Sequence, residues 1–110
     1  MDTLADVAPG LATEIGTALA AEGRGDLATQ LASAIIERCT YDASVDAGYV
    51  YLTRPATSLH FVKLATPVAE TISFLHSGFN VDVDHDGYIF GLELLSREDF
   101  FTQLRRADVL

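Results

Sequence analysis

The clearest hydrophobic pattern in the chain lies in residues 80–95, where apolar and polar residues alternate on both sides of an Asp-Gly pair. Asp-Gly favours a two-residue type I′ turn, because both central positions of that turn need a positive φ. With that pair as the turn, Val83 lies opposite Phe90 and Val81 lies opposite Leu92. The pattern predicts an antiparallel hairpin with an apolar and a polar face. The apolar face would hold Val81, Val83, Phe90, Leu92 and Leu94, and the polar face Asp82, Asp84, Gly91 and Glu93.

The same residues also match the calcium-binding loop of an EF-hand. That loop needs oxygen ligands at its first, third and fifth positions, a glycine at the sixth and a glutamate at the twelfth. Those positions are occupied by Asp82, Asp84, Asp86, Gly87 and Glu93. An EF-hand also needs a helix before the loop, but residues 73–81 include Gly78 and Asn80 and lack helical periodicity. We therefore favour the hairpin, and a calcium site at Asp82, Asp84, Asp86 and Glu93 is the alternative.

Residues 1–35 predict a helical hairpin. Pro9 suits the first turn of a helix, and apolar residues recur at helical spacing after it. The Gly-Arg-Gly sequence at 23–25 ends that helix. Asp26 is a favourable N-cap for a second helix, so we expect the second helix to begin there.

Residues 36–96 predict strands, because β-branched and aromatic residues dominate and turn residues separate them. We expect strands at 36–41 and 49–53 joined by a turn at 42–46, a short edge strand at 58–64, and another strand at 68–75. The hairpin of residues 80–95 follows. Gly91 lies inside its second strand, which indicates either a bulge or a close approach by another group.

Residues 96–110 predict a C-terminal helix. Ser96 and Asp99 resemble a capping box, with Ser96 as the N-cap. An apolar helix face would be formed by Phe100, Phe101 and Leu104. The chain of 110 residues therefore predicts one α+β domain: an N-terminal helical hairpin, an antiparallel sheet of four to five strands in meander order, and a C-terminal helix covering one face.

Two motifs in the strand region resemble a small bacterial family catalogued as domain of unknown function 2283. The first is Thr40-Tyr41-Asp42 followed by residues 46–52, and the second combines residues 70–72, 81–87 and 89–95. The resemblance covers about residues 38–96; the helical extension before residue 36 and the segment 54–67 depart from it. It implies an antiparallel hairpin, no catalytic residues and no cofactor. Some members are encoded beside small toxin-like proteins, so the resemblance also implies an antitoxin-like role.

Charge and cysteine content indicate which partners and which cellular location to expect. The formal net charge of −9 argues against nucleic-acid binding, which depends on basic side chains. No basic residue precedes Arg24, so we do not expect a signal peptide. Cys39 is the single cysteine and cannot form an intrachain disulfide, so we expect a cytoplasmic location. The chain contains no apolar run long enough to span a membrane.

The sequence shows no arrangement typical of an enzyme. His60, His76 and His85 are too widely spaced for a zinc motif with the single cysteine. No acid–base pair can be assigned, so we expect no catalysis. The expected function is a non-catalytic cytoplasmic interaction module without a cofactor. It would bind a protein partner, such as a small basic toxin, or a second copy as a homodimer, through a sheet edge or an acidic face. That acidic face would be formed by Asp82, Asp84 and Glu93.

Overall fold

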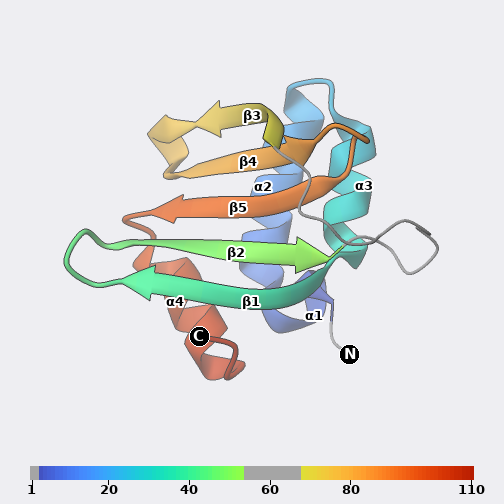
Figure 1. Cartoon of the computed structure of the whole chain (residues 1–110). Coiled ribbons are helices and arrows are strands. Elements are labelled where there is room, and N and C mark those ends of the chain that lie inside the picture. The colour runs from blue at the N-terminus through green and yellow to red at the C-terminus, as the bar shows by residue number, and fades with distance from the viewer. Residues whose placement is uncertain (1–2, 54–67) are drawn as a thin grey trace.

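The structure is a computed structural model that describes residues 3–53 and 68–110. Within those residues, four α-helices pack on one face of a five-stranded antiparallel sheet (Figure 1), which confirms the predicted α+β class. The elements are α1 (Leu4–Val7), α2 (Pro9–Ala21), α3 (Gly25–Ser33), β1 (Ile35–Asp42), β2 (Ala47–Thr53), β3 (Val68–Phe74), the 3₁₀ turn η1 (Leu75–Ser77), β4 (Phe79–Asp84), β5 (Ile89–Leu95) and α4 (Glu98–Arg106).

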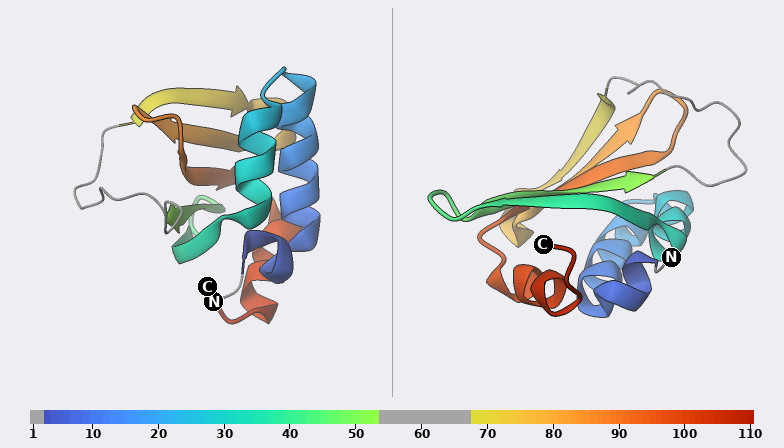
Figure 2. Two further views of the ribbon diagram at one scale, coloured as in Figure 1. Left: turned by 90° about the vertical axis from the view of Figure 1, so that its right-hand side faces the viewer. Right: turned by 60° about the horizontal axis from the view of Figure 1, so that its bottom comes forward.

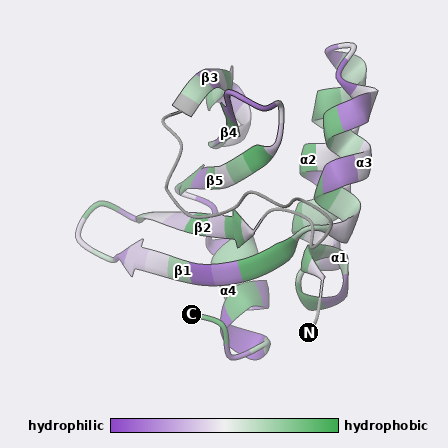
Figure 3. Cartoon of the chain, turned by 45° about the vertical axis from the view of Figure 1, so that its right-hand side comes forward, coloured by the Kyte–Doolittle hydropathy of each residue, from purple (hydrophilic) through white to green (hydrophobic). Residues whose placement is uncertain are grey.

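The strand order of the sheet is β1-β2-β5-β4-β3. Sequential strands pair within β1-β2 and within β3-β4-β5, as the predicted meander requires, but β2 pairs with β5 rather than with β3. This order places two apolar strands next to each other at the centre, where Val50 lies opposite Leu92. The edge strand β1 is hydrophobic at its start and strongly hydrophilic directly after it (Figure 3). The predicted strand at 58–64 lies outside the described residues.

The N-terminal helices form the predicted helical hairpin, with Pro9 in the first turn of α2. The predicted N-cap at Asp26 is wrong, because α3 begins at Gly25 and its N-cap is Arg24. The Arg24 carbonyl accepts the amide hydrogens of Leu27 and Ala28, which starts the helix earlier and leaves Asp26 in its first turn. The short helix α1 was not predicted, although a capping box formed by Thr3 and Asp6 marks its start.

The C-terminal helix begins differently from the prediction. Ser96 is not its N-cap: Arg97 holds that position without a side-chain cap, and Ser96 has a φ of 55°. The Ser96 amide instead donates to the Asp46 carbonyl over 2.8 Å. The Asp99 carboxylate, expected in the capping box, accepts hydrogen bonds of 3.0 and 2.8 Å from the Arg97 guanidinium. Long-range contacts of the strand end therefore override the local capping motif.

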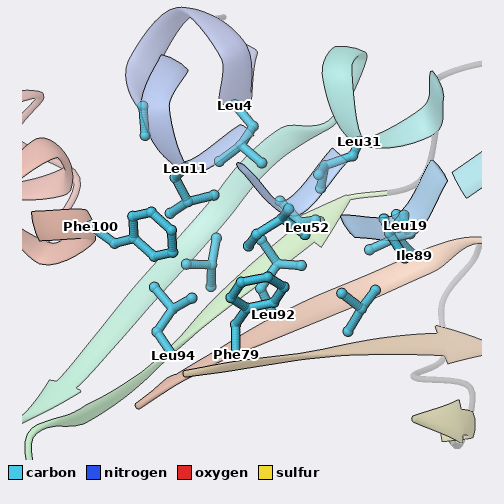
Figure 4. Packing of buried hydrophobic residues seen from close by; sticks show 14 of the residues in the cluster. Leu4, Leu11, Leu19, Leu31, Leu52, Phe79, Ile89, Leu92, Leu94 and Phe100 are labelled. Carbon is cyan, nitrogen blue, oxygen red and sulfur yellow. The ribbon is translucent and has the colours of Figure 1, made fainter. Parts of the chain in front are cut away.

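One apolar core fills the space between the helices and the sheet. In Figure 4, Leu11, Leu31 and Phe100 of the helices point towards Leu52 and Leu92 of the sheet. Phe100, Phe101 and Leu104 are buried, which confirms the predicted apolar face of α4. Burying a side chain of this size contributes roughly 1.5–3 kcal/mol. The helices therefore cover one sheet face, and Figure 2 shows the opposite face, which we call the outer face, without a helix in the described part of the chain.

Candidate functional site

The predicted hairpin is present as β4 and β5, and Val81 lies opposite Leu92 as expected. The two-residue turn is wrong. The Asp84 amide donates to the Tyr88 carbonyl over 2.9 Å, and the Gly87 amide donates to the Asp84 carbonyl over 3.1 Å. These bonds enclose a three-residue loop that ends at Gly87, whose φ is 84°. A loop of this kind with glycine in the left-handed region is a common alternative to the type I′ turn.

The longer loop changes which side chains enter the core. Val83 lies opposite Ile89, not Phe90, because the register shifts at a bulge in β5. Ile89 is buried in the position that was predicted for Phe90, and Phe90 lies on the outer face beside Tyr49 and Tyr51. Gln30 of α3 stabilises this arrangement from the helix side. Its side-chain amide donates to the Gly87 carbonyl over 2.9 Å and accepts from the Ile89 amide over 3.0 Å.

Three aromatic rings and one arginine form the centre of the outer face. Ring centroids lie 4.6 Å apart for Tyr49 and Tyr51, 6.3 Å for Tyr49 and Phe90, and 6.4 Å for Tyr51 and Phe90. The guanidinium carbon of Arg38 lies 3.8 Å from the Tyr51 ring centroid, which is close enough for a cation–π interaction. We call Arg38, Tyr49, Tyr51 and Phe90 the aromatic cluster. Each of its rings is only partly buried.

A hydrogen-bond network lies beside the aromatic cluster. The Tyr49 hydroxyl donates to Asp82 over 2.6 Å, and the Thr71 hydroxyl donates to the other carboxylate oxygen of Asp82 over 2.7 Å. Two residues before Asp82 on β4, the Asn80 side chain donates a hydrogen bond of 2.8 Å to Glu93, which lies opposite it on β5. Burial raises the pKa of the Tyr49 hydroxyl above its usual range, and the hydrogen bond to Asp82 raises it further. The network therefore fixes the Tyr49 ring on the sheet.

Gly91 makes the position of the Tyr49 ring possible. A Cβ atom at Gly91 would collide with a ring carbon and with the hydroxyl oxygen of Tyr49. Only glycine leaves room for the ring to cross β5 at this point. The sequence indicated either a bulge or a close approach at Gly91, and both occur: the bulge lies next to it and Tyr49 lies against it.

The predicted acidic face is only partly formed. Asp82 and Glu93 lie on the outer face, but Asp84 is buried at the end of β4 with 5% of its surface exposed. The Asp84 carboxylate accepts hydrogen bonds from the amides of Asp86 and Tyr88 over 2.9 and 3.0 Å. It therefore stabilises the loop and is not part of an acidic surface.

The calcium alternative lacks the EF-hand frame, because strands and not helices flank the loop. Three of its carboxylates bond to separate groups: Asp82 to Tyr49 and Thr71, Asp84 to loop amides, and Glu93 to Asn80. In residues 3–53 and 68–110, no three acidic, histidine or cysteine side chains form a group that could hold a metal ion. Calcium binding stays a prediction, and a melting experiment described below tests it.

The remaining candidate residues are not brought together. His76 and His85 are exposed in η1 and in the hairpin loop, and His60 lies outside the described residues. Cys39 is partly buried, and desolvation raises the pKa of its thiol to about 11. A thiol with a raised pKa is a poor nucleophile at neutral pH.

Comparisons of the chain with models of known protein families, with curated proteins and with solved structures gave no match. The resemblance to the family of unknown function therefore stays a prediction. The outer face emerges as the candidate site from its geometry. Sequence analysis did not identify the aromatic cluster, although Tyr49 and Tyr51 are two residues apart in a strand and must share a face.

Proposed function

We propose that this protein is a non-catalytic interaction module that binds a protein partner through the outer face of its sheet. The observation that carries the proposal is the aromatic cluster on a face that no helix of the described chain covers. Tyrosine, phenylalanine and arginine are enriched at the centres of protein interfaces. The contacts that hold Tyr49 also reduce the conformational entropy that binding would cost.

The chemistry of the face favours a basic partner. The net charge of the chain is −9, and Asp82 and Glu93 border the aromatic cluster. Charge of this sign attracts a positively charged protein and accelerates their encounter. The resemblance to the family of unknown function adds an antitoxin-like role, in which the partner is a small basic toxin.

A cytoplasmic location is part of the proposal. No helix among the described residues has the length and apolar character needed to cross a membrane. Cys39, the single cysteine, offers no intrachain disulfide, which is typical of proteins in a reducing compartment.

The proposal is tested by capturing partners of the tagged protein from its native host and identifying them by mass spectrometry. We expect a stoichiometric basic protein that is retained by the wild type and lost with Tyr51→Ser and Phe90→Ser. Leu75→Ser is the matched control, because Leu75 is 64% exposed and lies in η1, away from the cluster. Raising the salt concentration should weaken capture, since screening reduces attraction between exposed charges.

Two results would contradict the proposal. One is equal retention of the same partner by the wild type and by both outer-face variants. The other is capture that does not change between low and high salt, which would exclude charge as the source of the attraction. Circular dichroism of each variant establishes that the fold is intact before the capture is compared.

A further inference from the structure

Strand β1 forms one edge of the sheet in the part of the chain that the structure describes (Figure 1). Its first residue is covered, because Ile35 forms a bridge with Thr3. Beyond the irregularity between Ile36 and Arg38, residues 38–42 pair regularly with β2 on one side. The other side of this run has no strand beside it among the described residues. An edge of this kind offers a row of backbone donors and acceptors to an additional strand.

The charges on this edge are arranged symmetrically. Arg38, Thr40 and Asp42 are alternate residues of β1 and therefore lie on the same face of the sheet. All three are exposed. Arg38 and Asp42 carry opposite charges at equal distances on either side of Thr40, so the edge is complementary to a second copy of itself.

Only one register of an antiparallel, two-fold pairing uses this symmetry. With Thr40 opposite Thr40 of a second copy, Arg38 of each copy lies opposite Asp42 of the other. A register centred on Arg38 or on Asp42 would place like charges directly opposite, which is destabilising. Registers centred on Cys39 or Tyr41 would leave both charges opposite uncharged residues.

We propose that two copies of the chain dimerise by pairing their β1 edges in the Thr40-centred register, which joins two five-stranded sheets into one. Two symmetry-related ion pairs between Arg38 and Asp42 select the register. This dimer goes beyond the binding of a basic partner, because it uses the strand edge instead of the outer face. Arg38 is the one residue that belongs both to this edge pairing and to the aromatic cluster.

Both charged side chains are able to form the ion pair. The Arg38 guanidinium carbon lies over the Tyr51 ring, and a guanidinium in contact with a ring still has N–H groups that can donate to a carboxylate. The Asp42 carboxylate accepts hydrogen bonds of 2.6 and 3.0 Å from the hydroxyl and amide of Ser44. These bonds lower its pKa and favour its charged form.

The opposite edge, β3, lacks this pattern. The charged residue in its regular run is Glu70, which forms hydrogen bonds of 3.2 and 3.1 Å with Arg24 at the start of α3. Thr71 and Ser73 occupy the outer-face positions and carry no charge. Charge therefore selects a self-pairing register on β1 and none on β3.

Sedimentation equilibrium of the full chain tests the dimer. We expect the wild type to dimerise, and we expect Arg38→Asp and Asp42→Arg each to raise the dissociation constant at least about tenfold, because each reversal makes two attractive pairs repulsive. Glu37→Arg is the control: Glu37 is exposed in the same strand but lies at the irregularity, outside the paired run, and its reversal should leave the dissociation constant unchanged.

Mixing the two single variants gives the decisive measurement. In a heterodimer of Arg38→Asp with Asp42→Arg, both ion pairs are restored: one joins the two introduced side chains, and the other joins Asp42 of the first variant to Arg38 of the second. Native mass spectrometry of the equimolar mixture should therefore show the heterodimer at a concentration at which each variant alone is mainly monomeric. The double variant R38D/D42R should dimerise like the wild type for the same reason.

Three results would overturn the proposal. The first is a wild type that stays monomeric up to about 100 µM, a concentration at which dimers of micromolar affinity are populated. The second is dimerisation of both single variants as strong as that of the wild type. The third is failure of the mixed variants to form a heterodimer when each is shown by circular dichroism to be folded. None of these measurements depends on whether a basic partner is captured.

Discussion

The two faces of the sheet are built from the same strands but are specified in different ways. On the helix side, Phe79 and Leu92 are completely buried in an apolar core. On the outer face, Tyr49 and Phe90 are only partly buried and are held by ring contacts and by the hydrogen bond from Tyr49 to Asp82. Burial of apolar area stabilises the first face, and directional contacts order the second. We therefore expect substitutions on the outer face to change binding more than folding.

The largest expected difference between the two faces is in the stability lost when one phenylalanine on each face is replaced. Phe79→Ala should lower the free energy of unfolding by roughly 3–5 kcal/mol, because it leaves a cavity beside Phe74 and Phe100. Phe90→Ala should cost about 1 kcal/mol, since Phe90 remains partly in contact with solvent. Urea unfolding followed by circular dichroism measures both values. Equal costs would show that the outer face carries as much of the stability as the core.

Two glycines test whether close packing also orders the outer face. Gly91→Ala should destabilise the protein by about 1–3 kcal/mol, because the new methyl group collides with the Tyr49 ring. Gly16→Ala is the matched control: it lies in α2, where the added carbon would meet no other part of the described chain within 4 Å, and it should be stabilising by up to about 1 kcal/mol. In a Tyr49→Ala background, the cost of Gly91→Ala should disappear. A cost that persists there would place its origin in the backbone.

The Tyr49 hydrogen bond predicts a dependence of stability on pH. Tyr49 has a raised pKa in the folded protein, so its contribution is complete below the unfolded value of 10.0 and is lost as the pH rises above it. Tyr49→Phe should cost about 1 kcal/mol at pH 7. It should also reduce the loss of stability between pH 9 and pH 11, although Cys39 contributes a loss of the same sign. An unchanged alkaline profile in Tyr49→Phe would contradict the role assigned to the hydrogen bond.

The smallest expected effect concerns calcium. Because the structure gives Asp82, Asp84 and Glu93 separate hydrogen-bond partners, we expect the same melting temperature in millimolar calcium and in chelator. Calcium at about a hundred times its dissociation constant would stabilise the protein by roughly 2.7 kcal/mol. A calcium-dependent shift that is absent in Asp86→Asn would establish the alternative function and would show that the loop rearranges around the ion.

The β4-β5 hairpin shows which features of a strand pair can be predicted from the local sequence pattern. Alternation correctly predicts Val81 opposite Leu92, but the two-residue turn that it suggests also puts Phe90 in the core, and that prediction is wrong. Part of the missing information lies in Gln30, which hydrogen-bonds the loop from a helix far away in the sequence. A pattern within residues 80–95 does not contain that contact.

At the start of α4, a local sequence motif again fails to predict the structure. Ser96 and Asp99 have the spacing of a capping box, but Arg97 binds Asp99 and also forms hydrogen bonds of 2.7 Å with both carboxylate oxygens of Glu14 in α2. This network links two helices that are far apart in the chain. Arg97 takes the Asp99 carboxylate that the capping box would use, and the long-range contact with Glu14 holds Arg97 in the position to do so.

The sequence by itself determined the fold class, the helical hairpin that begins at Pro9, the apolar face of α4 and the core of the β4-β5 pairing. These features follow from residue spacing within one element, which the chain displays directly. Only the tertiary structure decided the pairing of β2 with β5, the outward position of Phe90 and the gathering of the aromatic cluster. Those features depend on packing and hydrogen bonds between residues that are distant in sequence, and their relative strengths emerge when the chain is folded.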